Sequence, residues 1–442
     1  MSDSKRFSVI TLGCKVNQYE EELMKERLIE GGFVLVRPEE ADVVIFNSCA
    51  VTEEALRKLL QKIRHVKRFN PYTKIIVTGC AVQTDFVRLE RSGIDALVGL
   101  DGKKDIDSVV YEVLEGSNVA SNPIRLSRNE RESLREVVSA NFWEKTRAFV
   151  KVEDGCDRAC TYCAIRLARG SRIRSKPIPL VLKEVTRLVQ SGFKEIVLIG
   201  VNLGRYGKNE NFSLSDLLKA LVDLNGDFRI RLSSLNPEDI TDDLLEVLRD
   251  PKICPHLHIS LQSGSDSVLS RMNRPYRIGD FMGIMEKLRK IDPLYSVSTD
   301  IIVGFPGETD EELSDTLSLF EHVDFSRVHV FRFSARKGTP AFSMKGQIDG
   351  STKKARARLV RESARNSVAR YLFRHIGKKR KVLVEERKQN ALWGYDEYYV
   401  KCALPLNVSA SDFVEVEATA LEFLDEEEPY LDCRFLHGWQ VG

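Results

Sequence analysis

Residues 147–163 read Arg-Ala-Phe-Val-Lys-Val-Glu-Asp-Gly-Cys-Asp-Arg-Ala-Cys-Thr-Tyr-Cys, a short apolar run followed at once by three closely spaced cysteines. The run predicts a β-strand, which places Cys156, Cys160 and Cys163 in the loop that follows it. Three thiolates in so short a loop can bind three irons of a cubane cluster and leave the fourth iron open to a small molecule. A structural zinc site would need four ligands, and the next cysteine is the distant Cys254. The loop therefore favours an iron–sulfur cluster over zinc.

The sequence beyond this loop continues as alternating strands and helices. Predicted strands cover residues 147–152, 194–199, 228–233, 256–261, 297–303 and 327–333. Predicted helices lie near residues 178–191, 214–224, 241–249, 277–291 and 310–322, the last after the capping box Thr309-Asp-Glu-Glu312. Six β/α units form either a partial barrel or an open doubly wound sheet, and the periodicity does not separate these two folds. We expect this domain to cover residues 143–376.

A separate α/β series precedes it. Strands are predicted over residues 7–12, 42–46 and 74–78, and helices over residues 19–30, 52–69 and 84–92. This alternation predicts a parallel sheet with right-handed crossovers, in a domain of residues 1–116. Residues 117–142 are polar, with little apolar periodicity, which suits a linker.

Three further cysteines fall at the ends of these N-terminal strands. Cys14, Cys49 and Cys80 each come just past the carboxyl end of a predicted strand. In an open α/β sheet these ends meet at one crevice, where ligands bind. The three thiols could hold a second cluster, and the alternative is three small buried residues, since free cysteine packs well in cores.

The C-terminal part has a different character. Short strands are predicted over residues 380–386, 398–403, 412–419 and 430–435, which indicates a small all-β domain, expected to be a barrel, over residues 377–442. Residues 353–381 form a predicted basic helix with twelve Lys or Arg against the single acid Glu362, whereas residues 412–432 are acidic. This separation points to a polyanionic partner, or more simply to a solvated helix face.

The overall composition is that of a globular protein. The 442 residues are 43% hydrophobic and 30% charged, and the net charge of +2 does not by itself indicate a nucleic-acid binder. No apolar run approaches the roughly 20 residues that span a bilayer, and the first residues lack the apolar segment of a signal peptide. We therefore expect a cytoplasmic location and no membrane contact. Nine cysteines in a reducing compartment indicate metal or redox chemistry.

The Cys-x-x-x-Cys-x-Tyr-Cys spacing resembles that of the radical S-adenosylmethionine (SAM) superfamily. More specifically, the chain is similar to the methylthiotransferase family along essentially its whole length. The resemblance rests on Gly13-Cys-Lys-Val-Asn-Gln-Tyr-Glu20, Asn47-Ser-Cys-Ala-Val-Thr52, Thr78-Gly-Cys-Ala81, Arg169-Gly-Ser-Arg-Ile-Arg-Ser175, Arg231-Leu-Ser-Ser-Leu-Asn-Pro237, His258-Ile-Ser-Leu-Gln-Ser-Gly264, Met272-Asn-Arg-Pro-Tyr276 and Phe331-Arg-Phe-Ser-Ala-Arg-Lys-Gly-Thr-Pro340.

This resemblance implies a Rossmann- or flavodoxin-like N-terminal domain, a partial (β/α)6 barrel and a C-terminal TRAM-like β-barrel. It also implies two [4Fe–4S] clusters, one on Cys156, Cys160 and Cys163 and an auxiliary one on Cys14, Cys49 and Cys80 that delivers sulfur. SAM would bind the open iron and yield a 5′-deoxyadenosyl radical. Residues expected to contact SAM are Tyr162, Asn202, Ser233, Ser234, Gln262, Ser263, Asp300, Gly304 and Glu308, although a polar residue at a strand end also suits a turn.

The family acts on two hypermodified adenosines of tRNA, or on an aspartate of a ribosomal protein. The motifs resemble most the branch that converts N6-threonylcarbamoyladenosine at position 37 to its 2-methylthio derivative. Isopentenyladenosine, the ribosomal-protein aspartate and a non-catalytic iron–sulfur or zinc RNA-binding protein are the alternatives. The implied partners are the tRNA anticodon stem-loop and an electron donor such as flavodoxin or ferredoxin. Residues expected to contact RNA are Arg174, Arg336, Lys378, Lys379, Arg380, Tyr398 and Tyr399.

Overall fold

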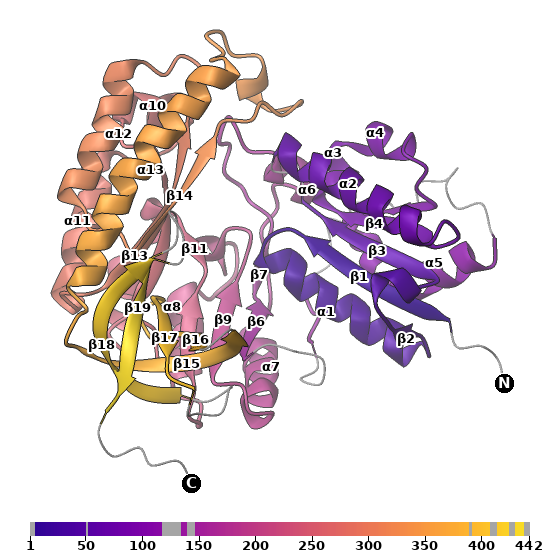
Figure 1. The fold of residues 1–442 in the computed structure, drawn as a ribbon, viewed down its shortest axis with the longest axis horizontal. Coiled ribbons are helices and arrows are strands. Elements are labelled where there is room, and N and C mark those ends of the chain that lie inside the picture. Colours follow the sequence, from indigo (N-terminus) through magenta and orange to yellow (C-terminus); the bar gives the residue numbers. More distant parts are fainter. Residues whose placement is uncertain are drawn as a thin grey trace.

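The fold comprises an N-terminal α/β sheet, a larger set of parallel strands with outer helices, and a small β-barrel (Figure 1). The computed structural model describes residues 5–49, 52–116, 134–138, 146–388, 391–406, 413–423 and 429–436. The predicted mixed α/β fold with parallel sheets is confirmed, and so is the all-β character of the C-terminal part. None of the described helices combines the length and apolar character needed to cross a membrane.

The N-terminal sheet has five parallel strands in the order β2-β1-β3-β4-β5. Its strands are β1 (Arg6–Leu12), β2 (Val34–Leu35), β3 (Val43–Ser48), β4 (Lys74–Gly79) and β5 (Ala96–Val98). Every residue of β3 is buried because helices cover both faces of the sheet. Helices α1 (Lys15–Glu30) and α5 (Ile106–Leu114) cover one face, and α2 (Glu53–Phe69), α3 (Cys80–Thr84) and α4 (Phe86–Glu90) cover the other.

The central region contains two parallel sheets, β10-β9-β6 and β11-β12-β13-β14. Their strands are β6 (Arg147–Lys151), β9 (Glu195–Ile199), β10 (Arg229–Leu232), β11 (Ser234–Leu235), β12 (His256–Gln262), β13 (Ser296–Val303) and β14 (Arg327–Arg332). A short hairpin of β7 (Glu153–Asp154) and β8 (Arg174–Ser175) flanks them, and α6 (Ile165–Arg169) follows the three-cysteine loop. The outer helices are α7 (Ile178–Gln190), α8 (Leu214–Val222), α9 (Asp242–Val247), α10 (Asp266–Arg271), α11 (Ile278–Ile291), α12 (Asp310–His322) and α13 (Gly350–Phe373).

The main hydrophobic core lies between these strands and the outer helices. Ile230, Ile259 and Val297 point toward it, together with Val181 of α7 and Phe281 of α11. Because side chains alternate along a strand, their neighbours point to the opposite side of the sheets, which we call the inner face. Helix α12 starts at the predicted capping box, in which the Thr309 side chain accepts a hydrogen bond from the Glu312 backbone.

The C-terminal strands close into a barrel in the order β15-β16-β17-β19-β18. They are β15 (Lys379–Lys388), β16 (Ala391–Tyr395), β17 (Lys401–Leu404), β18 (Phe413–Phe423) and β19 (Pro429–Phe435). The sequence patterns did not predict β16. The predicted basic helix over residues 353–381 is partly wrong, because α13 ends at Phe373 and Lys379 already begins β15.

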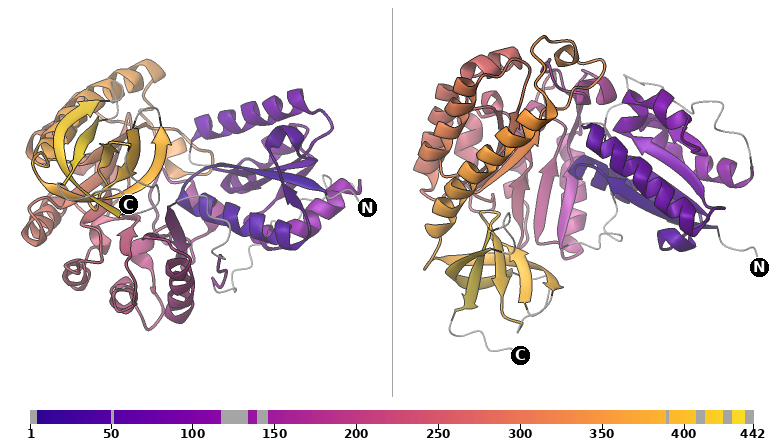
Figure 2. Two further views of the ribbon diagram at one scale, coloured as in Figure 1. Left: turned by 60° about the horizontal axis from the view of Figure 1, so that its bottom comes forward. Right: turned by 45° about the horizontal axis from the view of Figure 1, so that its top comes forward.

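The N-terminal domain lies beside the central region, as both views in Figure 2 show, and two helices make contacts between them. Helix α1 lies against β6, where Val16 and Tyr19 pack with Phe149. Helix α3 packs on α6. Of the predicted linker 117–142, the structure describes only residues 134–138. Val138 in this short part is buried in the same contact between α1 and β6. The remainder of that prediction lies outside the described residues.

Candidate active site

The loop that carries Cys156, Cys160 and Cys163 follows the hairpin strand β7, at the carboxyl end of β6. Gly155 turns the chain into this loop with φ +104°, and a Cβ there would lie 2.0 Å from the carbonyl oxygen of Arg172. The position therefore requires glycine. The backbone amide of Cys163 donates to the carbonyl of Cys160 at 3.2 Å, which holds the loop in a tight turn.

Two side chains donate hydrogen bonds to sulfur atoms of this loop. Asn202 Nδ2 lies 3.4 Å from Cys156 Sγ, and Arg274 Nη1 lies 3.1 Å from Cys160 Sγ. Asn236 links the two donors, because its Nδ2 donates to Asn202 Oδ1 at 2.8 Å and its Oδ1 accepts from Arg274 Nη2 at 2.6 Å. Donors of this kind stabilise thiolates, the form in which cysteine binds metal.

The surroundings of the loop fit a cluster with a small ligand. Burial raises the pKa of Cys163 to about 11, and a bound metal would reverse this effect because it binds the thiolate. Ser233 follows β10, one strand away from the strand that precedes Asn202. Its Oγ is buried and has no hydrogen-bond partner in the described chain, so it can still bond to a ligand.

The other residues predicted to contact SAM occupy varied positions. Ser263 and Gln262 are buried at the end of β12, and Gln262 has φ +76°. Glu308 accepts from the Gly304 backbone at 2.7 Å and pairs with Arg356 at 2.8 Å, so its carboxylate already stabilises its own loop. The remaining three are the half-buried Tyr162 beside Phe305 and Phe333, the exposed Ser234, and Asp300 on the inner face.

Cys14, Cys49 and Cys80 follow three neighbouring strands whose ends are in register. Leu12 of β1 pairs with Ser48 of β3, and Ser48 pairs with Gly79 of β4. The three cysteines therefore follow strand ends that lie at one edge of the sheet. Gly79 permits this edge, since it has φ +98° and a Cβ there would lie 2.3 Å from the Ser48 carbonyl oxygen.

Helix α3, which begins with Cys80 of the first cysteine group, packs on α6, the helix that follows the second group. Cys80 is buried as the first residue of α3, and its side chain packs on Ala168 of α6. Helix α6 begins two residues after Cys163. The sheet edge with the first cysteine group and the loop with the second group thus face one region of the molecule.

A buried network of charges fixes this contact. Glu20 of α1 receives Arg169 Nη1 of α6 at 2.8 Å and Lys151 Nζ of β6 at 2.8 Å, and also pairs with Lys103. Burial opposes ionisation of Glu20, but Arg169, Lys103 and Lys151 hold its pKa well below its usual value. Asp154 adds a second carboxylate at 3.1 Å from Arg169. Breaking such a pair leaves an uncompensated charge, which typically costs about 3–5 kcal/mol.

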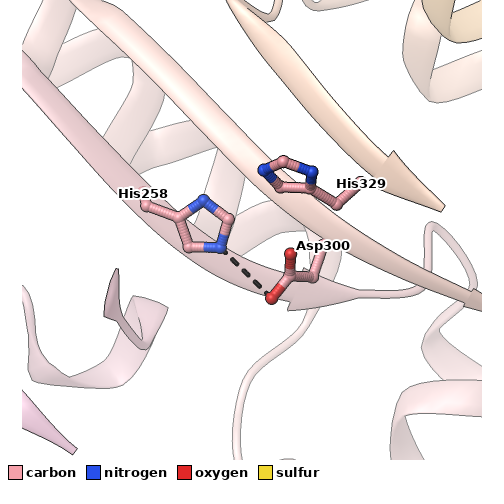
Figure 3. Close-up of side chains that lie close together, drawn as sticks. All are labelled: His258, Asp300 and His329. Carbon is pink, nitrogen blue, oxygen red and sulfur yellow. Dashed lines mark ion pairs between the residues drawn. The ribbon is translucent and has the colours of Figure 1, made fainter. Parts of the chain in front are cut away.

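The inner face of the parallel sheets is polar. His258, Asp300 and His329 come from three adjacent strands and point toward one another (Figure 3). His258 Nε2 lies 3.2 Å from Asp300 Oδ2, and the ligand atoms of all three side chains lie within 4.8 Å of one another. Ser298 connects this group to His256 through hydrogen bonds of 3.0 and 3.1 Å. These side chains can bind a polar ligand or a metal ion.

Cations gather on the other central sheet, on β6 and β10. Arg147, Arg229 and Arg231 surround the buried Glu195, and the C-terminal barrel inserts Tyr399 among them. Burial alone would raise the pKa of Tyr399, but Arg147, Lys15 and Arg231 lower it to about 8. Tyr399 also has φ +63°, an uncommon backbone conformation for a bulky residue.

Several residues predicted to contact RNA lie in interdomain contacts instead of on an open surface. Arg336 is buried and pairs with Glu53, the first residue of α2, and with Asp85, which precedes α4. Arg380 of β15 is buried, and Tyr399, between β16 and β17, is half-buried against Arg231. Tyr398 is half-buried and donates to Asp292 at 2.6 Å, and Arg174 lines a cavity of 570 Å³ near Glu20. Lys378 and Lys379 are exposed and remain candidates for RNA contact.

Comparisons with known proteins agree with this arrangement. The model of the uncharacterized protein family UPF0004 matches residues 6–99, and that of the radical SAM superfamily matches residues 150–320. The threonylcarbamoyladenosine tRNA methylthiotransferase MtaB of Thermotoga maritima is 47% identical over 97% of both chains. The chain belongs to the MtaB family of methylthiotransferases. The Bacillus subtilis MtaB is 37% identical over 88% of both chains.

More distant relatives and solved structures share parts of this family's architecture. A tRNA-2-methylthio-N(6)-dimethylallyladenosine synthase of Clostridium botulinum is 32% identical over 87% of both chains. The radical SAM methyltransferase TsrM of Kitasatospora setae has a TM-score of 0.58 at 15% identity, with 76% of this chain and 75% of that chain covered. This likeness supports the fold alone.

Membership of the MtaB family makes the chain a radical SAM methylthiotransferase, for which a [4Fe–4S] cluster and SAM are implied. The sequence patterns did not identify the residues whose side chains link the cysteine loop to the neighbouring strands and helices. Arg274, Asn236, Glu20 and Arg169 all stand within the motifs that carry the family resemblance. Their contacts join segments far apart in the sequence, so their partners could not be read from the motifs.

Proposed function

We propose that this protein converts N6-threonylcarbamoyladenosine at position 37 of tRNA to its 2-methylthio derivative, with two [4Fe–4S] clusters and SAM. The observation that supports the proposal is the packing of Cys80, at the sheet edge that carries the first cysteine group, against α6, the helix that follows the second group. The first group would hold the cluster that provides sulfur, and the second would hold the cluster that binds SAM. Relatives named for this substrate reach 47% identity over 97% of the chain, whereas the dimethylallyladenosine enzymes are 32–35% identical over 79–87% of it.

A reduced cluster with SAM supplies a 5′-deoxyadenosyl radical when both are bound. The protein must therefore hold the radical source, the sulfur source and the substrate base at fixed distances. Asn202 and Arg274 orient the sulfur atoms of the SAM-binding loop. The network around Glu20 and Arg169 holds the two domains together at the contact where both cysteine groups lie. Positioning of this kind can lower a barrier by about 7–11 kcal/mol.

The tRNA would be held chiefly by exposed cations. On α13, Lys354, Arg361 and Arg365 are exposed, and the exposed Lys378 and Lys379 lead from this helix to the barrel. Their charges suit phosphate groups. In this proposal the central strands form a partial (β/α)6 barrel and the C-terminal barrel serves as a TRAM-like module. A flavodoxin or ferredoxin would deliver electrons in the cytoplasm.

The proposal is tested by nucleoside mass spectrometry of tRNA from a strain that lacks this gene. We expect 2-methylthio-N6-threonylcarbamoyladenosine to disappear, its unthiolated precursor to accumulate and the isopentenyl analogue to stay unchanged. A plasmid copy should restore the product, whereas a copy with Cys156→Ala should not. Persistence of the product in the deletion strain would refute the proposed substrate.

A further inference from the structure

Lys15 is a cation on the inner face without an ionic partner of its own. It is the first residue of α1, directly after Cys14, and it is half-buried. Its Nζ lies 5.7 Å from the ring centroid of Tyr399. Within the described chain, no carboxylate comes within ion-pair distance of its ammonium group. A half-buried ammonium without a countercharge is unfavourable unless a ligand provides one.

The cations around Lys15 already have partners. Arg229 Nε lies 2.6 Å and Arg231 Nε 2.7 Å from the carboxylate of Glu195. Arg231 also donates to the backbone carbonyls of Asp396 at 3.0 Å and Glu397 at 3.2 Å. The carboxylate of Glu195 is therefore already paired with the two arginines. Lys15 adds a positive charge that forms no ion pair with a carboxylate of the described residues.

Polar groups of the inner face lie near Lys15. Lys15 is close enough to both His256 and His329 to act on them electrostatically. His329 is exposed and belongs to the group with His258 and Asp300 (Figure 3). A purely hydrocarbon substituent would be expected in an apolar pocket, whereas a substituent with a hydroxyl and a carboxylate suits these donors and acceptors.

From these observations we infer that Lys15 binds the carboxylate of the threonylcarbamoyl group and thereby selects this substrate over adenosines with a neutral substituent. The inference rests on the proposed function, since it concerns the same substrate. Lys15 is a specificity-determining residue in this account. It provides charge recognition at the far end of the N6 substituent, while the chemistry occurs at the C2 atom of the base.

The position of Lys15 agrees with this geometry. Lys15 directly follows Cys14, which would hold the sulfur-providing cluster, so the backbones of the two residues are about 3.8 Å apart from Cα to Cα. The sulfur source and the carboxylate partner then flank one base. The carboxylate of SAM is a poorer candidate ligand, because its loop follows the carboxyl end of β6, whereas Arg147, beside Lys15, begins that strand.

The test measures RNA binding to the reconstituted protein. The probes are anticodon stem-loops with N6-threonylcarbamoyladenosine, with its methyl ester, which removes the charge, or with unmodified adenosine. Fluorescence anisotropy would give Kd for the wild type, Lys15→Met, Lys15→Arg and the control Lys290→Met, an exposed lysine of α11. Iron content is measured for each variant, because Lys15 adjoins Cys14. Lys15→Gln replaces Lys15→Met if the latter loses iron.

We expect the wild type, Lys15→Arg and the control to prefer the free acid over the ester by at least about tenfold, as for a hydrogen bond to a charged group. In Lys15→Met this preference should fall to about one, with ester binding unchanged. Equal loss of affinity for all three RNAs, or a retained preference, would overturn the inference. If one of these outcomes is found but the wild type still methylthiolates the stem-loop with N6-threonylcarbamoyladenosine, only the inference about Lys15 fails and the proposed function stands. If the wild type forms no such product, the proposed function fails instead.

Discussion

Arg274 contacts the loop of Cys156, Cys160 and Cys163 although it lies 114 residues away from Cys160 in the sequence. Its guanidinium donates to Cys160 Sγ at 3.1 Å and also to Asn236 and the phenol oxygen of Tyr276. It therefore places a permanent positive charge beside the sulfur. Charge and hydrogen bonds at the ligating sulfurs are among the factors that set the reduction potential of a cluster.

Substitution of Arg274 by Met should make the reduction potential of the cluster on Cys156, Cys160 and Cys163 more negative. The variant removes a cation and a donor that stabilise the reduced, more negative form. Redox titration followed by electron paramagnetic resonance measures this shift, with Lys290→Met as the control. A potential unchanged from the wild type would show that Arg274 does not act on the cluster.

At the same scale, the individual cysteines were predictable from the sequence, whereas several of their partners were not. Cys14 and Cys80 follow clear apolar strand patterns, so their shared edge follows from parallel topology. The roles of Arg336 and Tyr399 depend on how domains dock. Both carry polar groups typical of RNA contacts, but docking buries Arg336 and half-buries Tyr399, and local patterns contain no information on docking.

At the scale of elements, the contact of α1 and α6 with β6 depends on Glu20. We expect Glu20→Gln to lower the free energy of unfolding by about 3–5 kcal/mol, because Arg169, Lys103 and Lys151 would lose their shared countercharge. Urea unfolding measures the difference. Glu362→Gln on α13 is the matched control, since its pair with Arg358 is exposed and should cost at most about 1 kcal/mol. Equal effects of the two variants would contradict this assignment.

The junction between α13 and the barrel should respond to acid. His375 packs between Tyr371 and Tyr398, and neither ring nitrogen has a hydrogen-bond partner in the described chain. Burial, with Arg380 and Arg374 nearby, lowers the pKa of His375 from 6.5 to about 2. The unfolded chain therefore binds a proton below pH 6.5 that the folded protein does not. The free energy of unfolding is therefore unaffected by protonation of His375 above pH 6.5, and it decreases as the pH falls from 6.5 toward 2.

The His375→Phe variant keeps the ring packing and removes the titration. Between pH 6.5 and 5, the wild type should lose up to about 1.4 kcal/mol per pH unit relative to this variant. Thermal unfolding at a series of pH values provides the comparison. Parallel curves for the two proteins would show that His375 is not the buried neutral group.

At the same scale, β16 shows why one element was missed. The segment around Trp393 is short and contains Gly394, so its pattern is weak, and pairing with β15 and β17 in the closed barrel stabilises it. The junction at Phe373 was missed for a related reason. Basic residues continue through Lys381, but Gly377 has φ +74°, which suits the turn between helix and strand.

At the scale of the whole molecule, tRNA binding should depend on salt through the exposed cations of α13. Replacing Lys354 and Arg361 with Ala should lower the slope of log affinity against log salt by about 0.7–0.9 for each cation that contacts a phosphate. Binding of the full tRNA at several salt concentrations measures the slope. An unchanged slope would place the RNA elsewhere on the protein. The acidic residues 412–432 should lie away from the RNA, although residues 412 and 424–428 are outside the described part of the chain.

The central claim is that one cysteine group makes the radical and the other provides sulfur. It is tested most directly by assaying 5′-deoxyadenosine and the 2-methylthio product together, with two triple variants. Replacement of Cys156, Cys160 and Cys163 with Ala should abolish both. Replacement of Cys14, Cys49 and Cys80 with Ala should keep about half the iron and SAM cleavage, but no methylthio product should form. A methylthio product from the second variant would contradict the account.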